Sequence, residues 1–418
     1  MLKKLFLFFW FFCFLYKPEF IFIPHSINMF MGFIGLILST RTNVKNIINS
    51  RTDARINDII KLILPFMIIS VFSMIINMSS DMKFIRYGMS VFLAYYGAYW
   101  LAYMFYKCYG TLNLKILVRY LLFATLFHQL IALIMFFDSS IYNILQSFVR
   151  SDASAMEAMD RTLGIRLQGL GASFFTAGLI YGYVLIILAL ALKQGVFNTK
   201  EQSFILTSYM FITLVGIMMA RTTIVGFAIG LVILFSYYVT SFSKFIKTFI
   251  SFVLIISVLY IAVIYIYPSI LSDFEGLFAF AFEIINNYND SGEIQSGTTD
   301  SLLEMWGTIP STLKTWLIGD ARWTAADGRH YYMKVDVGYL RNLWYFGLIG
   351  TFIYLLYNFN SLKLVLDRRC VFNKNVGCYA WIALFLYTLI INTKGPIDLL
   401  LYIFPFLFID KYANSLKF

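Results

Sequence analysis

The sequence predicts an all-α polytopic integral membrane protein, and three features of its 418 residues lead to that prediction. Hydrophobic residues make up 60% of the chain and charged residues only 13%, about half the charged share of a typical soluble domain. The apolar residues gather in runs near the length of roughly 20 residues that a helix needs to cross a hydrocarbon core. Aromatic residues make up 19% of the chain, which excludes a disordered protein. The net charge of +11 does not indicate nucleic acid, because the basic residues lie mostly between apolar runs.

Read by this length rule, the chain contains about twelve candidate spans in a single membrane domain, residues 1–418. They are residues 4–22, 26–39, 62–79, 84–106, 115–137, 170–192, 203–219, 222–240, 247–267, 335–357, 376–391 and 397–409. The first is expected to remain as an uncleaved span, because Lys17-Pro18-Glu19 stands where a signal peptide would carry a small-residue cleavage site.

The basic residues of the connecting segments set the orientation of the spans. Lys and Arg gather in segments 40–61 and 363–374 and near both ends of the chain. Alternation of the spans places all of them on one side, which the positive-inside rule identifies as the cytoplasm. Both termini are therefore predicted to be cytoplasmic, and an even number of spans agrees with this.

Two connections on the outer side are long, namely residues 138–169 and 268–334. Ordered connections longer than about 12–15 residues are usually functional. Within the second loop, apolar residues recur at helical spacing in 269–287 and 301–317, which is typical of helices lying on the membrane–water interface. A plain packing role for these two helices is favoured over a functional one.

The outer side should contain few arginines, yet a set of them falls there. Arginine at membrane depth costs about 2.5–3.5 kcal/mol unless it is paired or solvated, and its planar fork suits bidentate binding of phosphate. A single arginine of this kind is explained by a contact with a lipid headgroup or by a nearby carboxylate. The whole set of arginines favours an anionic ligand, such as a lipid-linked phosphate or a sugar phosphate. The arginines are Arg150, Arg161, Arg166, Arg221, Arg322, Arg329 and, just inside a span, Arg341; the carboxylates are Asp138, Asp152, Glu304 and Asp320.

Aromatic residues crowd the second long loop and the span that follows it. They are Trp306, Trp316, Trp323, Tyr331, Tyr332 and Tyr339. Aromatic faces stack on sugar rings, which would suit a sugar ligand. An interfacial aromatic belt explains each of them equally well.

Three motifs share one resemblance. Arg166 and Gly182 are separated by fifteen residues, as are Arg322 and Gly338. The turn Ala220-Arg221-Thr222-Thr223 opens a span that contains Gly226 and Gly230, and the tract 319–350 runs from Gly319-Asp320 through Asp336-Val337-Gly338-Tyr339-Leu340 to Gly347-Leu348-Ile349-Gly350. By these motifs residues 160–355 resemble the O-antigen polymerase and ligase superfamily, and the paired Arg-x15-Gly spacing resembles its O-antigen polymerase (Wzy) family.

One departure from the superfamily pattern favours polymerase over ligase. Ligases carry His-Asn/Ser/Gln-x9-Gly-x-x-Gly in this loop, whereas here Asp336 occupies the His position and Val337 the polar one. Asp336 is thus a candidate general base, and His330 competes for that role. Two other readings of Asp336 stay open: an ion pair with Arg329, Lys334 or Arg341, or neither role.

The resemblance implies a GT-C-like inverting glycosyltransferase at the periplasmic face of a bacterial inner membrane. Such an enzyme joins undecaprenyl-pyrophosphate-linked oligosaccharide repeat units during O-antigen synthesis. By analogy, Arg166 and Arg221 would bind the pyrophosphate, Arg322, Arg329 and Tyr339 would bind phosphate or sugar, and Asp336 or His330 would act on the acceptor. Membrane lipid and a chain-length regulator protein are the further partners that the resemblance implies.

No motif indicates a metal or a cofactor. The sequence contains no Asp-x-Asp and no P-loop, and its four cysteines show no Cys-x-x-Cys spacing. This predicts a metal-independent enzyme whose donor is activated by its pyrophosphate leaving group. The alternatives are an O-antigen ligase, a capsule or exopolysaccharide polymerase and, from another class, a lipid-linked oligosaccharide flippase.

Overall fold

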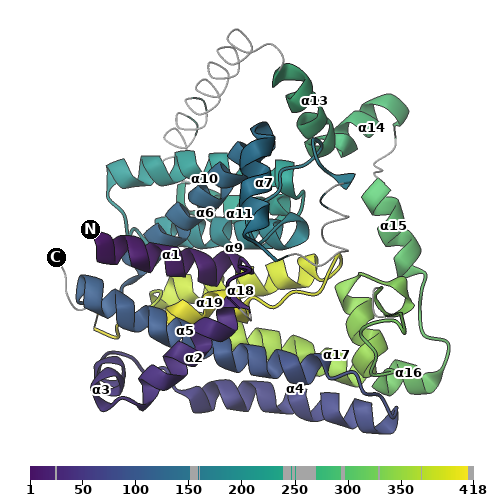
Figure 1. Ribbon diagram of the computed structural model, residues 1–418, viewed down its shortest axis with the longest axis horizontal. Coiled ribbons are helices and arrows are strands. Elements are labelled where there is room, and N and C mark those ends of the chain that lie inside the picture. The colour runs from purple at the N-terminus through teal and green to yellow at the C-terminus, as the bar shows by residue number, and fades with distance from the viewer. Residues whose placement is uncertain are drawn as a thin grey trace. The chain divides into compact units, whose positions relative to one another are not determined.

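The computed structural model describes residues 1–23, 26–150, 159, 161–238, 246, 250, 270–292, 297–327, 330–368 and 370–412 (Figure 1). These residues form helices, one short 3-10 turn and two isolated β-bridges, which confirms the all-α class. Their contacts group the chain into two compact units, each described by itself. Unit 1 contains residues 1–10, 27–113 and 297–418, and unit 2 contains residues 11–26 and 114–296.

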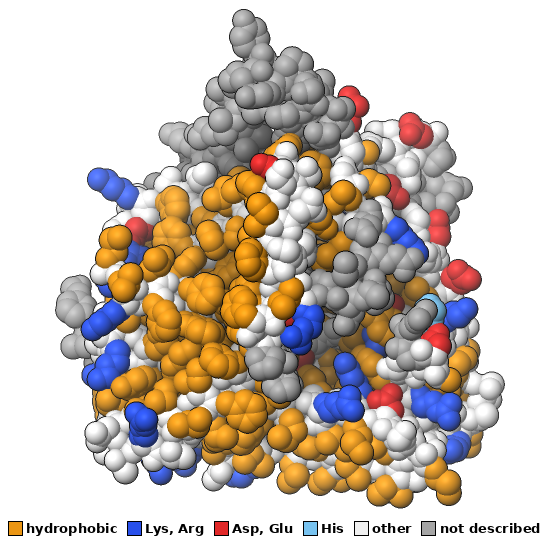
Figure 2. Space-filling view, in the orientation of Figure 1, with side chains coloured by type: hydrophobic (Ala, Val, Ile, Leu, Met, Phe, Trp, Pro, Cys, Tyr) orange, Lys and Arg blue, Asp and Glu red, His pale blue; other side chains and the backbone are white. Residues whose placement is uncertain are grey.

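Helices suited to a membrane confirm the polytopic character of the chain. Among the described residues, six helices are long and apolar enough to cross a membrane, and each overlaps a predicted span. They are α4 (Ile56–Ile76), α6 (Leu114–Phe137), α9 (Phe174–Lys193), α10 (Thr199–Met219), α17 (Gly338–Leu366) and α18 (Lys374–Ile391). On α4 the large apolar side chains of Ile68, Phe72 and Ile75 are exposed, and hydrophobic side chains cover much of the face shown in Figure 2. Apolar surface of this kind is stable in contact with lipid rather than water.

Of the other predicted spans, 84–106 forms the 27-residue helix α5 (Lys83–Tyr109), and the rest form shorter helices or fall outside the described residues. Helix α1 (Leu2–Tyr16) ends before the predicted limit of span 4–22, because Pro18 disfavours the helical conformation at Lys17. Helix α19 (Leu400–Leu407) covers part of span 397–409, and span 247–267 lies outside the described residues. The total of about twelve spans therefore stays a prediction.

Unit 1 is arranged around α17 (Figure 1). Helices α4, α16, α18 and α19 pack against α17, and α2, α3, α4 and α19 pack against α5. The helices not yet given are α2 (Ile27–Thr40), α3 (Thr42–Arg51), α15 (Gly297–Trp306) and α16 (Leu313–Ile318), with a 3-10 turn at Tyr332–Lys334. Helix α17 is interrupted at Gly347, whose φ of 65° and ψ of −167° are not helical.

Unit 2 is arranged around α9, which is buried along almost its whole length. Helices α6, α10 and α11 (Thr223–Tyr238) pack against it, and α13 (Ile270–Ala281) packs against α10. Two shorter helices, α7 (Ser139–Ser147) and α14 (Glu283–Ser291), adjoin α6 and α13.

The two helices expected in the second long loop are present, each broken into two. The predicted 269–287 forms α13 and α14, which meet at Phe282. The predicted 301–317 forms α15 and α16, because Gly307 and Pro310 lie between them and interrupt the helix. The first pair belongs to unit 2 and the second pair to unit 1.

Candidate functional site

Close glycine contacts position the first pair of predicted arginines within unit 2. A Cβ atom at Gly226 of α11 would lie 2.1 Å from the Cα of Gly182 on α9, so the two helices cross too closely for a side chain at position 226. Next to this crossing, a Cβ at Gly178 would lie 2.3 Å from Oγ1 of Thr222. The motif residue Gly226 and its neighbour Gly178 therefore allow the 220–223 turn, with Arg221, to lie against the beginning of α9.

Arg166 and Arg221 lie over the same aromatic ring. Their guanidinium carbons are 4.4 Å and 4.8 Å from the ring centroid of Phe280 on α13, and that of Arg166 is also 4.8 Å from the ring of Phe174. Arg221 Nη1 forms an ion pair with Oε2 of Glu283 at 2.8 Å. Arg166 Nη2 donates a hydrogen bond to the carbonyl oxygen of Met219 at 3.1 Å. The structure thus brings together the two residues that the sequence assigned to a pyrophosphate.

Arg166 and Arg221 place two positive charges close together. Burial and the neighbouring charge of Arg221 lower the pKa of Arg166 to about 10, so Arg166 is still protonated at neutral pH. Its Nε is buried without a hydrogen-bond partner among the described residues. Neighbouring guanidiniums are well suited to binding an anion that has several acceptor oxygens.

In unit 1, Arg341 is enclosed by two aromatic rings. Its guanidinium carbon is 3.7 Å from the ring centroid of Trp323 and 3.5 Å from that of Tyr331. The side chain of Arg341 is only 5% exposed, and its Nη1 pairs with Oδ1 of Asp336 at 3.4 Å. Of the readings open for Asp336, the ion pair with Arg341 is therefore confirmed, while its role as a base stays a prediction.

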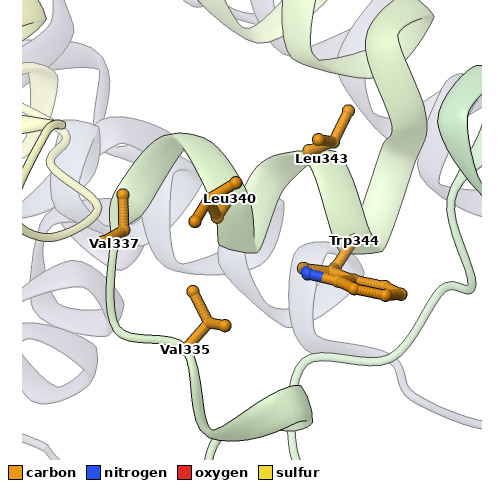
Figure 3. Close-up of a cluster of buried hydrophobic side chains, with 5 residues drawn as sticks. All are labelled: Val335, Val337, Leu340, Leu343 and Trp344. Atoms are coloured by element: carbon orange, nitrogen blue, oxygen red, sulfur yellow. The ribbon is translucent and has the colours of Figure 1, made fainter. Parts of the chain in front are cut away.

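A hydrophobic cluster fixes the backbone around Asp336. Val335 and Val337 are buried with Leu340, Leu343 and Trp344, and Figure 3 shows the two valines directed toward this cluster. Because side chains alternate along extended backbone, the residue between the valines faces the other way. The carboxylate of Asp336 is 53% exposed as a result.

The environment of Asp336 shifts its titration. Loss of hydration raises the pKa of the Asp336 carboxyl above its usual value, and the positive charges of Arg341 and Lys394 oppose that rise. A raised pKa brings a carboxylate closer to the basicity that a general base needs near neutral pH.

The remaining predicted site residues divide into those with internal partners and those open to solvent. His330 is exposed and pairs through Nδ1 with Oδ2 of Asp327 at 2.5 Å. Tyr339 donates its hydroxyl to the carbonyl oxygen of Leu389 at 2.8 Å, which leaves its ring as the group that could contact a sugar. Arg322 is exposed at the surface of unit 1. Arg329 lies outside the described residues.

Two residues of these sites were not singled out from the sequence, namely Phe280 and Glu283, which lie on amphipathic helices that were assigned to packing. Arg341 was singled out by its position just inside a span, which is costly in a membrane. Trp323 and Tyr331 were noted as aromatic residues of the loop, but their contact with Arg341 could be identified only from the folded structure.

The described residues offer no obvious metal site, and comparison with known proteins supplies no relative. Within the described ranges, no group of three or more His, Cys, Asp or Glu side chains is placed to hold a metal ion. No family model, curated protein or solved structure matches the chain.

Proposed function

We propose that this protein is an O-antigen polymerase, an inverting glycosyltransferase that joins undecaprenyl-pyrophosphate-linked oligosaccharide repeat units. The observation that carries the proposal is the pair Arg166 and Arg221, whose guanidiniums lie over the ring of Phe280, with Arg221 also ion-paired with Glu283. Both arginines stand in the motifs on which the resemblance to O-antigen polymerases rests. A paired guanidinium site of this charge suits a pyrophosphate, which carries several acceptor oxygens.

In this proposal the reaction is a displacement at the anomeric carbon of the donor sugar. The hydroxyl oxygen of the acceptor sugar attacks the anomeric carbon of the donor sugar, and the bond from that carbon to the pyrophosphate oxygen breaks. Asp336 accepts the hydroxyl proton, and Arg166 and Arg221 stabilise the negative charge that develops on the leaving pyrophosphate. Arg322, Arg329 and the ring of Tyr339 are proposed to bind phosphate or sugar, and His330 is the competing candidate for the base.

The setting of the reaction belongs to the same proposal. About twelve spans in a GT-C-like arrangement would place the long loops in the periplasm and both termini in the cytoplasm of a bacterium, in its inner membrane. The protein would work with membrane lipid and a chain-length regulator protein, without a metal or another cofactor.

The polysaccharide pattern of a deletion strain tests the function. We expect lipopolysaccharide with at most one repeat unit, and long chains should return with the wild-type gene. Arg166→Ala and Arg221→Ala should abolish the long chains without lowering the amount of protein in the membrane. Arg161→Ala is the matched control, since Arg161 is an exposed arginine of the same loop, and it should restore a normal ladder. A normal ladder from Arg166→Ala or Arg221→Ala would contradict the pyrophosphate assignment of that residue.

The same strain separates the alternative functions. Loss of every repeat unit, including the first, would indicate an O-antigen ligase or a flippase, and a defect in capsule or exopolysaccharide alone would indicate a polymerase of those polymers. One observation favours the flippase as the second candidate, namely the break in α17 at Gly347, because interrupted helices are common at transporter binding sites. Polymer synthesis by the purified protein from lipid-linked repeat units would exclude the flippase.

A further inference from the structure

A pocket of about 390 Å³ opens in unit 2 beside Arg166. The end of α6, helix α7 and the loop 163–168 form its walls. The lining residues are Met135, Phe136, Ser139, Tyr142, Asn143, Leu163, Gly164, Arg166 and Gln168. Neither the O-antigen polymerase motifs nor the arginine pair accounts for this pocket, because Arg166 is the only motif residue in its walls.

One wall of the pocket is polar and held in place. The hydroxyl of Tyr142 donates to Oε1 of Gln168 at 3.1 Å, and Nε2 of Gln168 donates to the carbonyl oxygen of Met159 at 2.6 Å. Ser139 and Asn143 lie on α7, the helix that also contains Tyr142, and are exposed.

The start of α7 is fixed by a cap. The carboxylate of Asp138 accepts hydrogen bonds from the backbone N–H groups of Ser140 and Ile141, which fixes where α7 begins. This wall offers hydroxyl and amide groups at set positions, as the recognition of a sugar requires.

Arg166 joins the pocket to the arginine pair. Its side chain lines the pocket, its guanidinium lies over the ring of Phe280 that it shares with Arg221, and its Nε has no hydrogen-bond partner among the described residues. A ligand in the pocket would therefore have a phosphate-binding group at one end of it and neutral polar groups along its wall.

We infer that this pocket binds the sugar directly attached to the pyrophosphate of the lipid-linked repeat unit. The inference rests on the proposed function and extends it, since it assigns selection of the first sugar to Ser139, Tyr142, Asn143 and Gln168. The volume of the pocket, about 390 Å³, is at the small end of the roughly 300–1,000 Å³ typical of ligand pockets. This volume suits one sugar ring rather than an oligosaccharide. A phospholipid headgroup shares the phosphate chemistry, so the experiment must separate a sugar phosphate from a glycerol phosphate.

The test is a calorimetric titration of the full-length protein in detergent micelles. The probes are inorganic pyrophosphate, glycerol 1-phosphate and the 1-phosphates of glucose, galactose and N-acetylglucosamine. Ser139→Trp fills the pocket, and Ser140→Trp is its matched control, because Ser140 is an exposed neighbour on α7 that does not line the pocket. We expect at least one sugar 1-phosphate to bind at least tenfold more tightly than glycerol 1-phosphate. Ser139→Trp should weaken that binding at least tenfold, while pyrophosphate binding by Ser139→Trp and all binding by Ser140→Trp should stay within twofold of wild type.

The outcomes separate the pocket from the proposed function. In one outcome, pyrophosphate binds to the wild-type protein and Arg166→Ala weakens that binding, while Ser139→Trp leaves sugar phosphate binding within twofold of wild type. The pocket inference is then wrong, and the pyrophosphate site stands. Equal affinity for glycerol 1-phosphate and the sugar phosphates would also overturn the inference, because it would indicate a lipid-headgroup site. Failure of pyrophosphate to bind the wild-type protein would instead contradict the proposed function.

Discussion

Asp336 and Arg341 form an ion pair whose two members have very different environments. The side chain of Arg341 is 5% exposed and that of Asp336 is 53% exposed. The guanidinium is held between the rings of Trp323 and Tyr331, so its position is set by packing, whereas the carboxylate remains accessible to a substrate. In the proposed reaction Arg341 would position Asp336 and would also set the electrostatic potential at its carboxylate.

This arrangement predicts the pH dependence of the reaction. The pKa of Asp336 is raised by loss of hydration and lowered by the charge of Arg341. A base works when ionised, so activity should fall as pH drops through that pKa. Arg341→Gln removes a charge that lowers the pKa of Asp336, so the acid limb should move to higher pH. Polymer synthesis by the purified protein as a function of pH measures this.

Two controls make the pH prediction specific. Arg341→Lys keeps the positive charge and should leave the acid limb near its wild-type position, even where the overall rate falls. Asp336→Asn should abolish synthesis, and Asp336→Glu should retain part of it. An acid limb that does not move in active Arg341→Gln protein would show that Asp336 is not the titrating base.

At the scale of single helices, α4 supports the break in α17. The hydroxyl of Ser73 lies 2.9 Å from the carbonyl oxygen of Ile318 and 3.0 Å from that of Tyr345, and Nδ2 of Asn77 donates to the carbonyl oxygen of Gly319 at 2.9 Å. An interrupted helix leaves backbone carbonyls without helical partners, and burying them unsatisfied is costly. Helix α4 supplies the missing donors from its side chains.

Ser73→Ala should therefore destabilise unit 1. It removes the donor hydroxyl from the carbonyl oxygen of Ile318, at a cost of about 1–3 kcal/mol, whereas the carbonyl of Tyr345 still accepts from the backbone N–H of Ala321. Ser70→Ala is the control one turn earlier on α4, because among the described residues its hydroxyl bonds to the carbonyl oxygen of Phe66 in the same helix. We expect a lower midpoint of thermal unfolding in detergent for Ser73→Ala than for Ser70→Ala, and equal midpoints would contradict the supporting role of Ser73.

Gly347→Ala should lower the midpoint of thermal unfolding further than Ser73→Ala does. The φ of 65° at Gly347 is combined with a ψ of −167°, a region that essentially only glycine occupies and that costs other residues about 1–3 kcal/mol. An added Cβ would also lie 2.2 Å from the carbonyl carbon of Leu317 on α16. The control is Gly110→Ala, since Gly110 has a positive φ of 74° but nothing within 4 Å of an added Cβ. A thermal midpoint for Gly347→Ala no lower than that of Gly110→Ala would exclude the close approach as the cause.

At the scale of the whole molecule, the predicted orientation of the spans has a direct test. Cys108 and Cys370 fall in segments predicted to be cytoplasmic, and both are partly accessible. A membrane-impermeant maleimide should therefore leave the wild-type protein unlabelled in intact spheroplasts and label it after permeabilisation. Ser140→Cys places a thiol on α7 in the first long outer loop and should be labelled without permeabilisation. Labelling of Ser140→Cys only after permeabilisation would reverse the orientation.

The sequence by itself determined the membrane class, the helical content and the position of six apolar helices long enough to cross a membrane, because each depends on the local spacing of apolar residues. It also singled out a set of arginines, whose place on the outer side of the membrane stays a prediction. Helix ends were less predictable where one residue decides them, as Pro18 does for α1.

Only the tertiary structure decided which of these residues act together. The contacts of Arg166 with Phe280 and of Arg341 with Trp323 join segments that are far apart or folded back in the chain, and the pocket beside Arg166 needs α6, α7 and the loop after them at once. The local spacing of apolar residues carries no information on such contacts, because they follow from how the helices cross. In unit 2 the crossing depends on the close approach of Gly182 and Gly226. The fold thus turns a scattered set of arginines into one site with two guanidiniums over a single ring and another with a guanidinium enclosed beside a carboxylate.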